Sequence, residues 1–245
     1  MDPASAVQIL AQDREVLFEL LADAATASEA AAELCEHPEW LHGRPPVELL
    51  LALTHLDYDV EAPVFDLARR WEREPICRAL VAALRDEPDA KLREHGAWLL
   101  KHLGAPSALS SLAELAKSDA EPVAVRRWLL EAITRLVAGG GIGWSQVGDL
   151  VSALGRHPDA SLRDGVIAVI AALDRCEEKR RALVDVLRTD EDETVLASAV
   201  YALTSALPID LDPAVAERLL GHPSPRVQSS VVELIERSKQ RAVKA

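Results

Sequence analysis

The chain has 245 residues, which is enough for one large domain or two small ones. Apolar residues make up 49% of it but aromatic residues only 4%, so most of the apolar content is alanine, leucine and valine, which suit helices. The formal net charge of −13 argues against a general nucleic-acid-binding protein, which needs a basic face to displace counterions from phosphate. It is compatible with a protein partner, and a basic one in particular.

The N-terminal sequence MDPASAVQILAQDRE is acidic and lacks the basic start of a signal peptide, and no apolar run approaches the length of a membrane span. The three cysteines, Cys35, Cys77 and Cys176, are widely spaced and odd in number, which argues against a disulfide framework or a zinc site. We therefore expect a cytoplasmic protein with no membrane association, no metal and no cofactor.

Helical periodicity runs through almost the whole chain, and no alternation typical of a strand appears. Residues 1–73 predict irregular N-terminal helices whose phase the sequence does not fix. After them, short turns rich in proline and acidic residues end one helix and start the next. These turns are DEPDA (86–90), SDAEP (118–122), RHPDA (156–160), TDEDE (189–193) and GHPSP (221–225).

Similar text follows each of these turns, so the segments can be aligned on the first apolar residue after the turn. The aligned residues are Leu92, Val125, Leu162, Val195 and Val227, at intervals of 33, 37, 33 and 32 residues. A nearly fixed period in this range predicts stacked helical hairpins.

The repeated pattern is a turn acid or Pro-Asp, then an apolar residue, then an arginine, as at Arg93, Arg126 and Arg163. Leu196 and Gln228 depart from it in the last two repeats. Over residues 75–238 the pattern resembles the HEAT-repeat family, particularly the short bacterial type also found in bilin-lyase-like proteins. The resemblance implies an all-α fold, a right-handed α-α superhelix (a solenoid) of about a dozen helices.

The same resemblance implies one solenoid domain over residues 1–245, with a basic tail at 239–245. It also implies that Arg93, Arg126 and Arg163 form a structural ladder, in which arginines hydrogen-bond the turns of adjacent repeats. His157 and His222 each precede a proline in a turn and are expected to cap that turn or lie in solvent rather than to bind a ligand.

The stretch VAGGGIGWSQ (137–146) is the one segment that looks like a phosphate-binding loop. A phosphate loop follows a strand and opens a helix, often with a nearby lysine and Ser or Thr. This stretch follows a predicted helix, lacks that lysine, and falls in the one interval of 37 residues. We therefore predict a lengthened linker between repeats.

Counted from the aligned residue, offsets 4, 5, 7, 8 and 11 are apolar in nearly every repeat and predict the buried stripe. Offsets 2, 3, 6, 9 and 10 are then expected to face outward along one concave surface. Tryptophan, tyrosine and arginine at these offsets are favoured at interface hot spots. The candidate binding residues are His95, Trp98, His102, Arg127, Trp128, Glu131, Arg135, Asp164, Gly165, Ala168 and Tyr201.

Two interpretations of Trp98 and Trp128 stay open: exposed contact residues, or half-buried rings that pack partly against the neighbouring repeat. The small residues Gly165 and Ala168 would let a partner approach the backbone closely.

Several functions are compatible with this fold. Iron-dependent HEAT-like hydroxylases need paired His-Glu dipeptides, and the chain has none. HEAT-like DNA glycosylases line a cleft with tryptophan and an acid, as Trp128 and Glu131 superficially suggest, but the acidic charge disfavours DNA. A bilin-lyase-like enzyme follows by fold analogy alone, and an immunity-type inhibitor of a basic toxin is a further alternative. We expect a non-catalytic scaffold, adaptor or regulator that binds a protein partner through the concave face.

Overall fold

The computed structural model describes residues 73–86, 90–206 and 211–242, together with seven single residues nearer the N-terminus. In these ranges every regular element is helical, and ten α-helices and one short 3-10 helix account for all of them. The prediction of an all-helical fold is therefore confirmed for the described part. The expected helices of residues 1–73, with Cys35, lie almost wholly outside it.

The chain divides into two compact units, residues 1–108 and residues 109–245. The first unit contains α6 (Arg73–Asp86), α7 (Ala90–Leu103) and the short η2 (Pro106–Ala108). α6 and α7 pack against each other. The packing is close at Gly96, where an added side-chain carbon would lie 2.7 Å from Leu84 Cδ2. Beside it, the buried thiol of Cys77 donates a 2.9 Å hydrogen bond to the Leu103 carbonyl.

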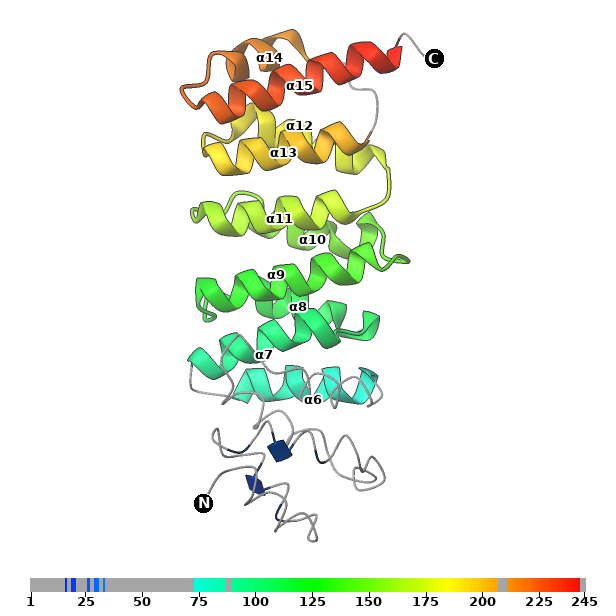
Figure 1. The fold of residues 1–245 in the computed structure, drawn as a ribbon, viewed down its shortest axis with the longest axis vertical. Helices are drawn as coiled ribbons and strands as arrows, with labels where there is room; N and C mark the ends of the chain where they lie inside the picture. The colour runs from blue at the N-terminus through cyan, green and yellow to red at the C-terminus, as the bar shows by residue number, and fades with distance from the viewer. Residues whose placement is uncertain are drawn as a thin grey trace. The chain divides into compact units, whose positions relative to one another are not determined.

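The second unit consists of four successive helix pairs. They are α8 (Leu109–Lys117) with α9 (Val123–Ala138), α10 (Trp144–Leu154) with α11 (Ala160–Ala172), α12 (Glu177–Thr189) with α13 (Glu193–Ala206), and α14 (Pro213–Leu220) with α15 (Pro225–Ala242). α9, α11, α13 and α15 pack in series, and α8, α10, α12 and α14 form a second layer behind them (Figure 1). The unit therefore has two helix layers, and each layer has its own outer surface.

Local chemistry sets the helix ends at the predicted turns. Asp159 caps α11, because its carboxylate accepts hydrogen bonds from the hydroxyl and the backbone N–H of Ser161, and these bonds hold its pKa below the usual range. Asp192 caps α13, because its carboxylate accepts the backbone N–H groups of Thr194 (2.9 Å) and Val195 (3.2 Å). α15 continues to Ala242, so the predicted basic tail of residues 239–245 begins within this helix. The reason is that no glycine or proline follows Pro225 to stop the helix.

The predicted apolar stripe is buried. In α11 and the residue after it, Val166, Ile167, Val169, Ile170 and Leu173 each expose no more than 4% of their surface. Leucines at the same offsets of α7 are equally buried. The helical period in the sequence thus identified the core-facing side of these helices correctly.

A buried lysine ties α12 to α11. Lys179 is 4% exposed, and its ammonium donates to the carbonyls of Ala171 (2.6 Å) and Leu173 (2.7 Å) at the end of α11. Loss of water lowers the pKa of this ammonium. The end of a helix carries partial negative charge, so the contact stabilises the lysine and fixes where α12 begins.

No helix in the described ranges combines the length and apolar character that crossing a lipid bilayer requires.

Candidate partner-binding surfaces

Arg126 of α9 lies almost wholly inside the protein, with 3% of its surface exposed. Its guanidinium donates to the Ala116 carbonyl (2.8 Å) in the last turn of α8 and to the Asp119 carboxylate (3.1 Å) in the turn between α8 and α9. The same group lies 3.4 Å from Nε2 of His157, at the turn before α11. Arg126 therefore connects two successive turns.

Arg163 of α11 repeats this arrangement one helix pair further on. It donates to the carbonyls of His157 (2.8 Å) and Pro158 (3.0 Å) in its own turn. It also makes two hydrogen bonds to the carboxylate of Asp190 in the next turn. Burial is the largest single influence on Asp190 and opposes its ionisation. The hydrogen bond and charge of Arg163, together with the backbone N–H groups of Glu191 and Asp192, outweigh burial and hold the Asp190 pKa below its usual range.

The later repeats lack this arginine and use other residues. Leu196 is fully buried, and Gln228 donates to the His222 carbonyl at 2.7 Å. Arg218 of α14 reaches the carbonyls of Leu187 and Asp190. Arg93, the first arginine of the expected ladder, lies half-buried in the first unit.

The histidines in these turns are structural. Nδ1 of His157 accepts the backbone N–H of Asp159 at 3.0 Å, and Nδ1 of His222 accepts that of Ser224 at 3.1 Å. Each ring thus caps its own turn, as predicted. Among the residues the structure describes, no group of three or more His, Cys, Asp or Glu is arranged to hold a metal ion.

The predicted outward residues of the second unit form a face on α9, α11 and α13, which we call the α9–α13 face. Its members are exposed (Arg127, Arg135, Ala168, Tyr201) or half-buried (Trp128, Glu131, Asp164, Gly165). Tyr201 is 76% exposed, the most of any large hydrophobic residue described. Trp128 is half-buried, which fits the interpretation of a partly packed ring.

Two expectations about outward residues were wrong, and Trp98 follows the packed interpretation. Trp98 is 9% exposed and buried in the first unit, and its ring meets that of the half-buried His102 edge-on at 5.0 Å. Ala197 and Thr204 of α13 are also buried. Residues 96–100 of α7 are all buried, so the buried side of this helix is wider than a simple stripe. His95, nearby on α7, is half-buried.

Gly165 serves helix packing. A side-chain carbon at this position would lie 2.8 Å from Leu130 Cδ1, and Leu130 is fully buried in α9. The glycine therefore lets α11 approach α9 closely. The expectation that Gly165 provides room for a partner is therefore wrong, because the side chain of Leu130 occupies that space. Ala168, one turn later, is exposed as expected.

The glycine-rich stretch joins two helices, since α9 ends at Ala138 and α10 begins at Trp144. Gly140 and Gly141 have φ values of +90° and +80°, which residues with a side chain rarely adopt. No strand precedes the stretch, in keeping with the predicted linker.

A groove that the sequence reasoning missed lies in the other helix layer, between α10 and α12. Two adjoining hollows of about 520 and 400 Å³ share Trp144, Ala182 and Asp185, and we call them together the α10–α12 groove. α8 packs closely on α10, whereas α12 touches α14 only lightly and makes still fewer contacts with α10. The side of α11 forms the floor of the groove at Val166 and Ile170.

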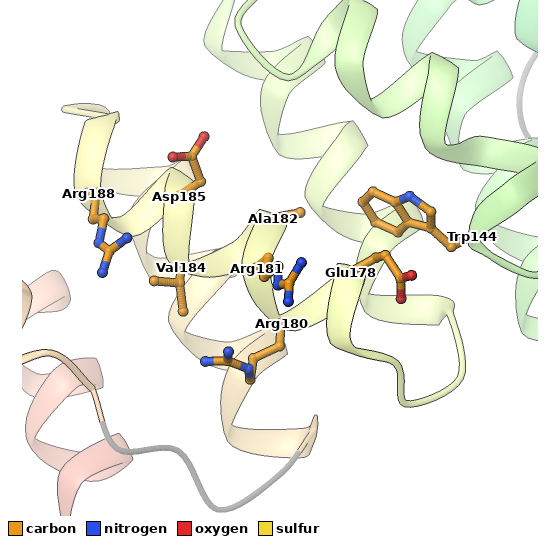
Figure 2. A pocket seen from close by; sticks show the side chains of 8 residues that line it. All are labelled: Trp144, Glu178, Arg180, Arg181, Ala182, Val184, Asp185 and Arg188. Atoms are coloured by element: carbon orange, nitrogen blue, oxygen red, sulfur yellow. The ribbon is translucent and has the colours of Figure 1, made fainter.

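Two signals in the sequence could have indicated this groove. Trp144 directly follows the glycine stretch and precedes Gly148 by one helical turn. On α12, Glu178, Arg181, Asp185 and Arg188 recur every three or four residues, so they share one helix face. In Figure 2 the indole of Trp144 lies beside the start of α12, and the arginines follow along that helix.

Comparison of the sequence with protein-family models and with curated proteins finds no match.

Proposed function

We propose that this protein is a non-catalytic scaffold, an adaptor or regulator, which binds a protein partner through the α9–α13 face. The observation that carries the proposal is the position of Tyr201. An aromatic ring that is 76% exposed stands on α13, beside the helix α11, which presents Ala168 to solvent. A large exposed side chain next to a small exposed residue gives an uneven surface against which a partner can pack. Tyrosine is enriched at the hot spots of protein interfaces.

We further propose that the helix pairs are HEAT-type repeats of a right-handed solenoid. The support is the nearly constant interval between the aligned apolar residues, together with the bonds of Arg126 and Arg163 to successive turns. In such a solenoid the helices of one layer line a common concave surface, which would be the α9–α13 face.

The charge of the molecule supports a basic protein partner over nucleic acid. The net charge of −13 repels phosphate and attracts a basic surface at long range. The free thiols of Cys77 and Cys176 are in keeping with a reducing compartment, so we place the protein in the cytoplasm.

The proposal is tested by affinity capture from the native host. The wild-type chain, a Tyr201→Ala, Trp128→Ala double variant and a Leu220→Ala control are immobilised in parallel, and captured proteins are compared by mass spectrometry. Leu220 is a 42% exposed residue on α14, in the other layer. We expect a partner that is captured by the wild type and the control but is lost with the double variant. Equal capture by all three would contradict the α9–α13 face as the binding surface.

A further inference from the structure

We propose that the α10–α12 groove is a second recognition site, which binds a short acidic peptide segment that carries an apolar side chain. The groove lies in the helix layer opposite Tyr201 and favours a ligand of opposite charge to the partner proposed above. It is therefore independent of the α9–α13 face.

The groove is held open by fixed contacts. At the start of α12, the buried Lys179 bonds the carbonyls that end α11. At its other end, Arg163 holds Asp190, and Arg218 bonds the carbonyl of Leu187. Both ends of α12 are thus tied to neighbouring helices, so the gap beside α10 belongs to the folded framework.

Trp144 provides an apolar contact at one end of the groove. The indole lies over Gly148 of its own helix, where any side-chain carbon would come within 2.8 Å of the ring nitrogen Nε1. The indole is half-buried and lines both hollows. Ala182 faces it from α12 and leaves room for a side chain between the two helices. A fixed, partly exposed tryptophan beside a small residue is typical of a hot-spot pocket.

Arginines outnumber acids in the lining of the groove, although the chain as a whole is acidic. The lining holds four arginines and two acids: Arg156, Arg180, Arg181, Arg188, Glu178 and Asp185. All four arginines pair with acids of the chain, and every one of these pairs is exposed: Arg180 and Arg181 with Glu177 at 2.6 and 2.9 Å, Arg156 with Asp185 at 3.5 Å, and Arg188 with Asp212 at 3.2 Å. Exposed pairs of this kind are weak, so a ligand carboxylate can replace the internal one at little cost. Arginine is also the side chain best suited to bind carboxylates through two hydrogen bonds.

The size of the groove and the net charge of the chain together select a short peptide. From Glu178 to Arg188, ten residues of helix extend about 15 Å, which corresponds to about five residues of extended peptide. A nucleic acid brings many phosphates and would meet the repulsion of a chain with net charge −13. A peptide with a few carboxylates around one apolar side chain carries much less negative charge, so it meets less of this repulsion while it still engages the arginines and the indole.

The test uses a fluorescein-labelled peptide with glutamates on both sides of a phenylalanine, measured by fluorescence anisotropy at low ionic strength, where charge attraction is least screened. We expect saturable binding to the full-length chain. Arg181→Glu with Arg188→Glu should weaken it by at least about tenfold, because like charges then face each other. Trp144→Ala should weaken it by about tenfold or more through loss of the apolar contact. A peptide with lysine in place of glutamate should not bind.

The matched control is Arg127→Glu with Arg135→Glu, which changes the net charge equally but lies on the α9–α13 face. It should leave peptide affinity unchanged. The proposal is overturned if the wild type does not bind, if both charge reversals weaken binding equally, or if the lysine peptide binds as well. All four arginine positions are exposed, so these variants are expected to fold even if Trp144→Ala does not. Circular dichroism checks each one.

Failure of this proposal is distinguishable from failure of the proposed function. Tyr201→Ala should not change peptide affinity, and the Arg181, Arg188 double variant should not change capture of a partner that depends on Tyr201. If one surface fails its test, the test of the other is unaffected.

Discussion

Arg163 holds Asp190 through two parallel hydrogen bonds, Nε to Oδ2 at 2.7 Å and Nη2 to Oδ1 at 3.0 Å. The two side chains come from successive turns, and their exposed fractions are only 16% and 7%. A third nitrogen of the same guanidinium bonds the His157 carbonyl. One side chain therefore fixes the spacing between two neighbouring helix pairs.

Replacing Arg163 should destabilise the fold strongly. In Arg163→Met, Asp190 would keep its charge in a mostly buried position without its partner, which costs about 3 kcal/mol for buried pairs. The matched control is Arg156→Met, whose pair with Asp185 is exposed on both sides and should contribute less than about 1 kcal/mol. Urea unfolding measures both. Similar losses of stability in the two variants would show that burial does not determine how much each ion pair contributes to the free energy of unfolding.

The same pair predicts a pH dependence. Because the folded-state pKa of Asp190 is lowered, its contribution to stability is complete above the ordinary aspartate range and is lost as the pH falls through the folded pKa. Wild type should therefore be more stable than Asp190→Asn at pH 6, and the difference should shrink as the pH falls below about 4. The other carboxylates titrate in both proteins, so their effects largely cancel in the difference in stability. A difference that stayed constant with pH, or grew on acidification, would contradict the assignment.

Two aromatic residues with the same predicted orientation should behave oppositely. Trp98 is 9% exposed, so Trp98→Ala should cost about 3 kcal/mol or more in the free energy of unfolding. Tyr201 is 76% exposed, so Tyr201→Ala should change stability by less than about 0.5 kcal/mol. Thermal unfolding followed by circular dichroism measures both. A large loss with Tyr201→Ala would remove the argument that its ring is available to a partner.

Much of the helical framework could be predicted because its signals are local. Proline and acidic residues at the turns fix where α9, α11, α13 and α15 begin, and Asp159 and Asp192 cap two of these helices through their neighbours in the chain. The apolar period then identifies the core side, as at Val166 and Ile170.

The candidate sites depend on contacts between helices, which periodicity does not encode. The period gives the direction of a side chain but not how far the neighbours cover it, so the sequence alone could not decide whether Trp98 is exposed or packed. Gly165 was assigned to a partner because its contact, Leu130, comes from another helix pair. The α10–α12 groove arises because these two helices make few contacts with each other, and no residue pattern in the sequence indicates how closely two helices approach.

The glycine stretch predicts no response to nucleotides. It joins α9 to α10 with no preceding strand, so ATP or a dinucleotide should leave the melting temperature unchanged. A ligand bound only by the folded state must raise this temperature, so a differential scanning measurement decides the question. A rise of several degrees would contradict the assignment of residues 139–143 as a linker.

Valine substitutions one turn apart on α11 should separate packing from binding. At Gly165 a side-chain carbon would come within 2.8 Å of the fully buried Leu130, so Gly165→Val should cost about 1–3 kcal/mol through overpacking. Ala168 is exposed on the same helix, so Ala168→Val should change stability by no more than about 0.5 kcal/mol. Urea unfolding compares the two. The added methyl groups at 168 would rise from the low surface beside Tyr201, so this variant should also reduce capture of the partner while it keeps the wild-type unfolding curve. If Ala168→Val captured the partner normally, that partner would not approach α11, and the binding surface would include Tyr201 but not Ala168.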